Sequence, residues 1–258
     1  MQHPYGHITL EKISPQLARL TLSHLRKRNA MTSAMWAALV QKLDDATKIE
    51  GLKALIITGD GDHFCAGADI SEFEHSHANI DTSRKAASLI CDGFDAVAKF
   101  PLPTLALIRG NCMGGGFGIA SACDLRFADE TAKFAIPPAK LGLIYPYENI
   151  GRMIDIIGLS TAKDWLLSAR IIRAEDALKA GFLTQLHVAH DLEPKTLDYA
   201  AQYNGLSHDS ITLMKEMFLS HQSTQSEESA AYFEKFVARF QSNAFKSAYR
   251  AFLSKSKS

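Results

Sequence analysis

The sequence predicts an α/β fold with a largely parallel sheet, and three observations support this prediction. Segments patterned as strands alternate with segments patterned as helices over residues 8–136. Two strand segments, 52–58 and 104–108, are almost entirely apolar, which is typical of strands covered on both faces. The turns between segments are short, as expected when helices connect parallel strands of one sheet.

Hydrophobic periodicity sets the limits of each expected element. The expected strands are 8–13, 17–22, 52–58, 104–108, 124–128, 133–136 and 183–188, of which the first two form a hairpin. The expected helices are 32–50, 81–99, 119–123, 151–157, 160–168, 174–180, 192–201, 207–219, 226–240 and 244–258. Because strands stop before residue 195, we expect a core of residues 1–195 and a helical C-terminal region of residues 196–258.

Composition and charge exclude several classes of protein. The 258 residues are 47% hydrophobic, enough for one large domain or two small ones. The 28 lysines and arginines balance the 28 aspartates and glutamates, so no bulk field favours nucleic acid. The chain shows no signal-peptide pattern and no apolar run long enough to span a membrane. We expect a cytoplasmic protein with neither nucleic-acid nor membrane partners.

The cysteine and histidine patterns give no sign of a metal site. Cys65, Cys91, Cys112 and Cys123 lack C-x-x-C spacing and lie in apolar runs, as buried free thiols of a reducing compartment do. The pair His75 and His77 lacks further ligands at metal spacing, so we expect it at the solvated surface.

A cluster of three glycines, 114–116, follows the strand at 104–108 and precedes a small-residue helix. Two needs explain it: close approach of the backbone to another group, and free N–H donors at the start of a helix. A ligand oxygen would meet those donors and the positive end of the helix. Tight helix–strand packing is the alternative. A dinucleotide fingerprint is imperfect, because Ser121 stands where its last glycine belongs.

A turn-rich loop, 59–70, follows the strand at 52–58 and ends in tiny residues. Asp69 and Glu72 have the spacing of a capping box, so Asp69 is expected to cap a helix. The N–H of Ala66 lies beside no bulky side chain and is a candidate donor. The basic run from Arg26 to Arg28 is either a solvated turn or a contact for phosphate.

Two motifs together resemble the crotonase superfamily, the enoyl-CoA hydratase/isomerase family, over nearly the whole chain. One is residues 64–70, FCAGADI, and the other is GxxxGGG at 110–116 followed by ACD at 122–124. Gly181 and the segment 251–255, AFLSK, add support. The resemblance implies a spiral core of ββα units and a helical C-terminal region that trimerises, as a homotrimer or as a dimer of trimers.

The resemblance also implies a chemistry, namely stabilisation of an acyl-CoA thioester enolate by two backbone N–H groups, without cofactor or metal, as in fatty acid metabolism. By match these donors belong to Ala66 and Gly115. Residues expected to contact the CoA thioester are Arg26, Ala30, Ala66, Gly67, Ala68, Asp69, Ile70 and Gly115. Phe252 and Lys255 match residues donated by a neighbouring subunit, with a solvated C-terminal helix as the alternative.

Two positions depart from the family pattern. Gly118 and Pro138 stand where the family usually has two catalytic glutamates, and neither can titrate. Tyr145 resembles the pocket tyrosine of decarboxylating members, and Glu148 is the one carboxylate of the loop 144–149. We hypothesise that Glu148, with Tyr145, moves the proton. Alternatively, Tyr145 packs in the pocket wall and Glu148 pairs with Arg152.

These observations predict an acyl-CoA-processing enzyme of the hydratase/isomerase type with relocated acid–base groups. The alternatives are an acyl-CoA decarboxylase, a thioester hydrolase and a non-catalytic CoA-binding protein. Decarboxylation creates an enolate by loss of carbon dioxide and then needs one proton donor.

Overall fold

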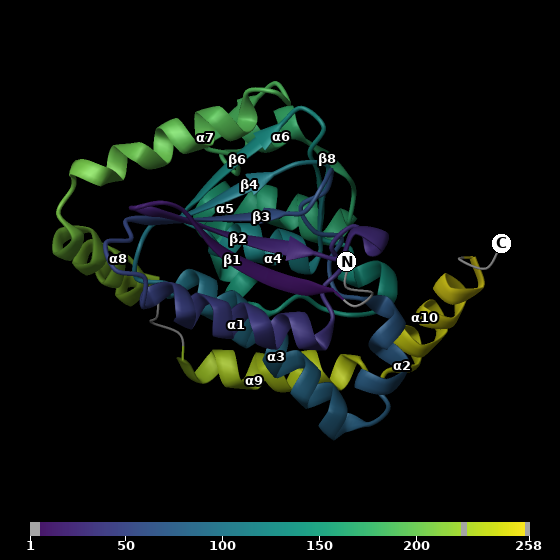
Figure 1. Cartoon of the computed structure of the whole chain (residues 1–258). Helices are drawn as coiled ribbons and strands as arrows, with labels where there is room; N and C mark the ends of the chain where they lie inside the picture. Colours follow the sequence, from purple (N-terminus) through teal and green to yellow (C-terminus); the bar gives the residue numbers. More distant parts are fainter. Residues whose placement is uncertain (1–5, 223–225, 256–258) are drawn as a thin grey trace.

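A six-stranded sheet with the order β1-β2-β3-β4-β6-β9 runs through the centre of the molecule (Figure 1). The computed structural model describes residues 6–222 and 226–255, without the side chains of 221, 222, 226–229, 231 and 255. The strands are β1 (His7–Ser14), β2 (Leu17–Ser23), β3 (Ala54–Gly59), β4 (Thr104–Ile108), β6 (Leu125–Asp129) and β9 (Gln185–His187). β1 pairs antiparallel with β2, and the other pairings are parallel. The predicted hairpin and parallel sheet are confirmed.

A smaller sheet of three strands, β5-β7-β8, lies beside the first. Its strands are β5 (Asn111–Met113), β7 (Lys133–Ala135) and β8 (Ile172–Arg173). Sequence reasoning missed β5 and β8 because runs this short show no alternation. β5 matters for the site, since it carries the chain from β4 into the glycine cluster.

Helices cover both faces of the large sheet. α1 (Ser33–Thr47), α3 (Ile80–Ala98), α4 (Gly115–Ala122) and α5 (Tyr147–Ser168) pack as successive neighbours on one side. α7 (Leu192–Ala201) packs against β4 and β6 on the other side, where Leu192 and Ala200 join a separate apolar cluster with Leu105 and Phe127. All residues of β3 and β4 are buried, as their apolar sequences predict.

Side chains fix the starts of two of these helices. Thr32 caps α1 by accepting a hydrogen bond from Met35 N. Asn79 and Thr82 form a capping box at the start of α3, one residue before the predicted start. The two helices expected at 151–157 and 160–168 belong to α5, which continues across a kink at Gly158 with φ +74°.

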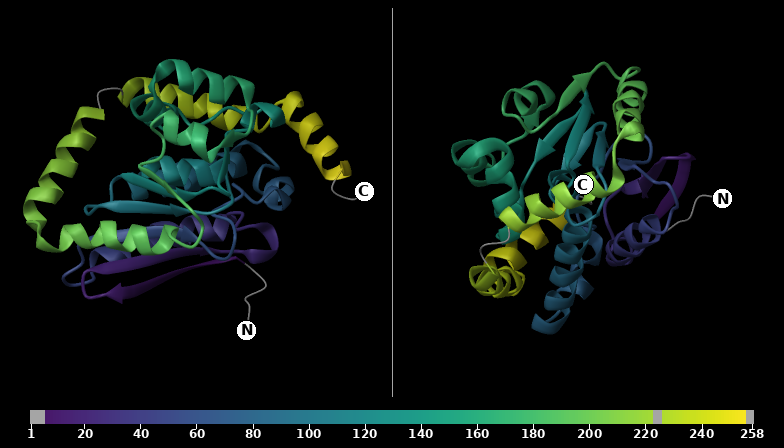
Figure 2. Two further views of the ribbon diagram at one scale, coloured as in Figure 1. Left: turned by 90° about the horizontal axis from the view of Figure 1, so that it is seen from above. Right: turned by 90° about the vertical axis from the view of Figure 1, so that its left-hand side faces the viewer.

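The C-terminal helices are α8 (His208–Gln222), α9 (Ser226–Arg239) and α10 (Asn243–Lys255). α8 lies at one end of the molecule between α7 and α9, as Figure 2 shows. Its Lys215 is buried and donates to Asp124 Oδ2 at 2.6 Å. α9 packs on α3 and α5. The expected boundary at residue 195 falls inside α7 and stays a prediction.

The remaining helices are short: α2 (Phe73–Ser76), α6 (Ala174–Lys179), and the 3₁₀ turns η1 (Leu25–Lys27), η2 (Ile70–Glu72), η3 (Pro138–Leu141) and η4 (Gln202–Gly205). His77, which follows α2, is only 6% exposed and stacks on Phe240 with ring centroids 3.7 Å apart. The prediction that it lies at the solvated surface is therefore wrong. The four cysteines are free, and all but Cys91 are fully buried.

Candidate active site

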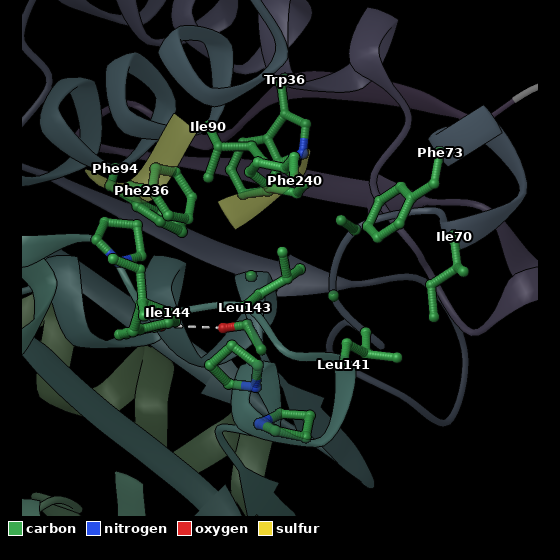
Figure 3. A pocket seen from close by; sticks show the side chains of 18 of the residues that line it. Trp36, Ile70, Phe73, Ile90, Phe94, Leu141, Leu143, Ile144, Phe236 and Phe240 are labelled. Carbon is green, nitrogen blue, oxygen red and sulfur yellow. Dashed lines mark hydrogen bonds between the residues drawn. The ribbon is translucent and has the colours of Figure 1, made fainter. Parts of the chain in front are cut away.

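An apolar cavity of about 130 Å³ opens where α4 begins. Side chains of α1, α3 and the α9 region form one wall, and residues 141–144 form the opposite wall (Figure 3). The labelled wall residues are Trp36, Ile70, Phe73, Ile90, Phe94, Leu141, Leu143, Ile144, Phe236 and Phe240. Among the described residues that line it, none is aspartate, glutamate, histidine, lysine, arginine or cysteine. The cavity can hold a hydrocarbon chain, and it offers no carboxylate or imidazole to move a proton.

Two loops meet at this cavity because backbone bridges hold them together. Cys65 and Cys112 form a parallel bridge, with Cys65 N donating to Asn111 O and Met113 N donating to Cys65 O, both at 2.9 Å. A second bridge joins Met31 to Ala68. Residues 66–68 therefore run beside residues 113–115, and both segments contribute backbone to the cavity wall.

The structure corrects one of the two predicted amide donors. Ala66 N donates to Arg28 O at 2.9 Å, so this N–H is already engaged. Ala68 N, two residues later, has no acceptor within the part of the chain that the structure describes. It lies 3.5 Å from the point that a Cβ on Gly115 would occupy. Gly115 begins α4, where N–H groups lack an intrahelical acceptor. Ala68 and Gly115 thus present the open pair of amides.

Close backbone approach explains the glycines around this pair. Gly67 has φ +99°, and a Cβ there would lie 3.0 Å from Met113 O and 3.4 Å from Gly115 N. A Cβ on Gly116 would lie 2.5 Å from Cys65 O. The glycine cluster therefore combines close approach of the backbone to another group, at Gly116, with an N–H at the start of a helix, at Gly115.

Tyr145 and Glu148 face different cavities. Tyr145 lines the apolar cavity, is 8% exposed, and donates from its hydroxyl to Gly114 O at 3.0 Å. Burial raises the pKa of its phenol far above the ordinary value. Glu148 lines a second cavity of about 350 Å³ between α3, α5 and α9. Phe94 and Pro146 line both cavities and so form their common wall.

The second cavity is polar and is organised by Arg152. This residue pairs with Asp95 at 2.7 Å and also donates to Asn149 Oδ1. Burial raises the pKa of the Asp95 carboxyl, but Lys99 and Arg152 lower it by more, so the carboxylate stays charged. Asn149 is completely buried, and sequence reasoning missed it. Its signal was a polar residue in the first turn of the helix that follows Tyr145.

Gly118 leaves no room for a carboxylate side chain, and Pro138 carries no titratable group. A Cβ on Gly118 would lie 2.4 Å from two ring atoms of Phe94 and 2.7 Å from Asn149 Nδ2. Pro138 begins η3 and lines the apolar cavity. Close packing by Phe94 and Asn149 therefore occupies the first of the two positions expected to carry a glutamate, and a cavity-lining proline occupies the second.

The residues predicted to contact CoA divide into two groups. Ala66, Gly67, Ala68, Ile70 and Gly115 line the apolar cavity. Ala30 is buried beside them, and Arg26 lies exposed on η1.

Asp69 has the predicted structural role. It caps η2 by accepting from Ser71 N at 3.1 Å and pairs with Lys27 at 2.7 Å. Burial raises its pKa, but Lys27 and Ser71 lower it by more. Glu72 does not complete a capping box, because its carboxylate accepts from the N–H and the hydroxyl of Ser33, each at 2.7 Å.

The last helix carries the two residues expected to serve a neighbouring subunit. α10 projects from the body of the molecule (Figure 1), and Phe252 on it is 45% exposed. The Lys255 side chain lies outside the described residues. Over residues 6–222 and 226–255, the side chains described form no cluster suited to a metal, and no helix could cross a membrane.

Comparisons with known proteins agree on one family. Its model, described as enoyl-CoA hydratase/isomerase, matches residues 12–258. The mitochondrial Delta(3,5)-Delta(2,4)-dienoyl-CoA isomerase of Mus musculus is 29% identical over 194 residues, which are 71% of this chain and 59% of that protein.

Two solved structures extend the likeness to the fold. An enoyl-CoA hydratase/isomerase family protein from Hyphomonas neptunium is 34% identical, with TM-score 0.80, over 96% of this chain and 95% of that one. Methylmalonyl-CoA decarboxylase in complex with 2-nitronate-propionyl-CoA is 25% identical, with TM-score 0.85, over 97% of this chain and 96% of that one.

Proposed function

The chain belongs to the enoyl-CoA hydratase/isomerase family, and on that premise we propose that it binds an acyl-CoA thioester and stabilises its enolate. The acyl group would occupy the apolar cavity, and the thioester oxygen would accept from the N–H groups of Ala68 and Gly115. The observation that carries the proposal is this pair of open amides at the wall of an apolar cavity. This step would need no cofactor, because the charge would develop on an oxygen that accepts from both amides.

The lining of the apolar cavity also bears on which reaction follows binding. Hydration requires groups that move the protons of a water molecule, and the described lining of the apolar cavity supplies no such carboxylate. Decarboxylation makes the enolate without removal of a proton by the protein, so this lining favours it as the second candidate. The likeness to methylmalonyl-CoA decarboxylase supports the same candidate. A role for Glu148 would require it to act across the wall formed by Phe94 and Pro146.

We further propose that the protein assembles with copies of itself. α8 carries an exposed apolar stripe made of Leu213, Met214, Met217 and Phe218, the last 70% exposed. A stripe of this kind marks a contact surface. In a trimer or a dimer of trimers, Phe252 and Lys255 of α10 would complete the site of a neighbour. Phe218→Glu should lower the molecular mass measured by sedimentation, and an unchanged mass would contradict the proposal.

Calorimetric titration with two thioesters tests the binding step. 2-Nitronate-propionyl-CoA is an anionic mimic of the enolate, and propionyl-CoA is its neutral counterpart. We expect the nitronate to bind at least about a hundredfold more tightly, as analogues of charged intermediates do. Equal affinities would reject the enolate-stabilising function, and failure to bind either thioester would reject acyl-CoA binding itself.

Turnover assays followed by mass spectrometry then distinguish the reactions. Crotonyl-CoA converted to a hydrated product would establish the hydratase activity, and methylmalonyl-CoA converted to propionyl-CoA would establish decarboxylation. Release of free CoA would indicate thioester hydrolysis. Binding of the nitronate without turnover across a panel of acyl-CoAs would indicate a non-catalytic CoA-binding protein.

A further inference from the structure

Four side chains form a line from the polar cavity to the apolar one. We name this line the polar chain, and its members are Asp95, Arg152, Asn149 and Tyr145. Asp95 accepts from Arg152 at 2.7 Å, and Arg152 also donates to Asn149 Oδ1. At the other end, the Tyr145 hydroxyl donates to Gly114 O at 3.0 Å.

Arg152 determines which way the Asn149 amide points. A guanidinium can only donate, so Asn149 must turn its oxygen toward Arg152 and its nitrogen away. Asn149 Nδ2 has no acceptor that meets full hydrogen-bond geometry among the described residues. Burial raises the pKa of the Tyr145 phenol and Asn149 lowers it, so the buried amide acts on the phenol.

Tyr145 acts on the same peptide that supplies the Gly115 amide. The Gly114 carbonyl and the Gly115 N–H belong to one planar unit. A hydrogen bond accepted by the carbonyl polarises that unit and strengthens the N–H as a donor. Gly114 O also accepts from Gly118 N at 3.0 Å, so the Tyr145 hydroxyl adds a second donor to a carbonyl that the first turn of α4 already orients.

We propose that the polar chain positions and polarises the Gly115 amide, so that side chains of the polar cavity set how tightly the apolar cavity holds a negatively charged thioester oxygen. Its members are positioning residues. Only Tyr145 among them lines the apolar cavity, and its hydroxyl hydrogen is donated to Gly114 O. The inference rests on the proposed function and explains why a polar cavity borders an apolar one.

The test measures the preference for the nitronate, defined as the Kd of propionyl-CoA divided by the Kd of 2-nitronate-propionyl-CoA. Tyr145→Phe removes the bond to Gly114 O and should lower this preference about fivefold, the worth of one hydrogen bond. Asn149→Leu should lower it about twofold, since its effect passes through Tyr145. The double variant should lower it no further than Tyr145→Phe does. Tyr147→Phe is the matched control, because it makes the same change two residues away.

The ratio separates positioning from a merely structural role. A structural role would weaken the binding of both thioesters equally and leave the preference for the nitronate unchanged. That result would overturn the inference. An equal decrease of the preference in Tyr145→Phe and in the control Tyr147→Phe would overturn the inference as well. If the unaltered protein shows no preference, the proposed function fails and the inference falls with it. If Asn149→Leu fails to fold, the nitronate preferences of Tyr145→Phe and Tyr147→Phe are compared and decide whether the inference holds.

Discussion

The two cavities that share Phe94 and Pro146 differ in almost every chemical respect. The first is walled by aromatic and aliphatic side chains, and its polar groups are backbone amides, the indole N–H of Trp36 and the phenol of Tyr145, which donates to Gly114 O. The second contains Arg152, Asn149 and several carboxylates. If the proposed function holds, binding of an anionic oxygen would rely on the main chain, because the charged side chains line the other cavity.

The largest expected effect on stability comes from removing an aromatic side chain from the wall of the apolar cavity. Phe240 is 2% exposed and contacts Phe73, His77 and Phe245. Phe240→Ala should lower the free energy of unfolding by about 4 kcal/mol, through lost transfer energy and a new void. Chemical denaturation measures this loss. Leu167→Ala, at a residue 79% exposed, is the control and should change stability little.

A methyl group at Gly67 should disturb the geometry of the two open amides. Gly67→Ala forces a residue with φ +99° to carry a Cβ 3.0 Å from Met113 O, beside Gly115 N. We expect the preference for the nitronate to fall about a hundredfold, near 3 kcal/mol, as when one oxyanion donor is lost. Gly151→Ala meets nothing within 4 Å and should leave the preference unchanged. A preserved preference in Gly67→Ala would remove these amides from the proposal.

Acid should loosen the aromatic wall through His77. Burial lowers the pKa of His77 from 6.5 to about 4, so the unfolded chain binds its proton first as pH falls. Stability is therefore complete above pH 6.5 and decreases toward pH 4, by about 3 kcal/mol for this group. His77→Phe should flatten that part of the profile in denaturation experiments. The exposed His75→Phe should not, and a wild-type profile in His77→Phe would contradict the assignment.

The smallest expected effect is that of Glu148→Gln. It tests whether the polar cavity takes part in proton transfer. Because Glu148 lines the polar cavity, Glu148→Gln should change turnover of crotonyl-CoA or methylmalonyl-CoA by less than about twofold, whichever is the substrate. Steady-state assays on the thioester that turns over measure this. A loss above tenfold would return Glu148 to the proton transfer that the sequence suggested.

The fold was largely predictable because its signals are local. Apolar runs at β3 and β4 and the periodicity of α1 each reflect burial that one segment reveals by itself. The sequence also indicated the two segments, 66–68 and 113–115, that meet at the apolar cavity. The sequence cannot distinguish Ala66 from Ala68, because the difference is a hydrogen bond to Arg28, thirty-eight residues before Ala66.

Tyr145 and Glu148 illustrate a second limit. Neighbours in sequence suggest a shared pocket, yet the start of a helix separates them onto different sides of Phe94. The expected helix 226–240 shows a third limit. Its sequence places Phe236 and Phe240 four residues apart on one face, but only the tertiary structure brings them to the apolar cavity.

The crowding at Gly118 has a consequence for how this chain can change over time. Phe94 and Asn149 occupy the volume that a side chain at this position would need. Gly118→Glu alone would therefore be blocked, and a carboxylate could enter this position only after Phe94 had become smaller. Substitutions that add new chemistry are therefore expected more readily elsewhere around the cavity.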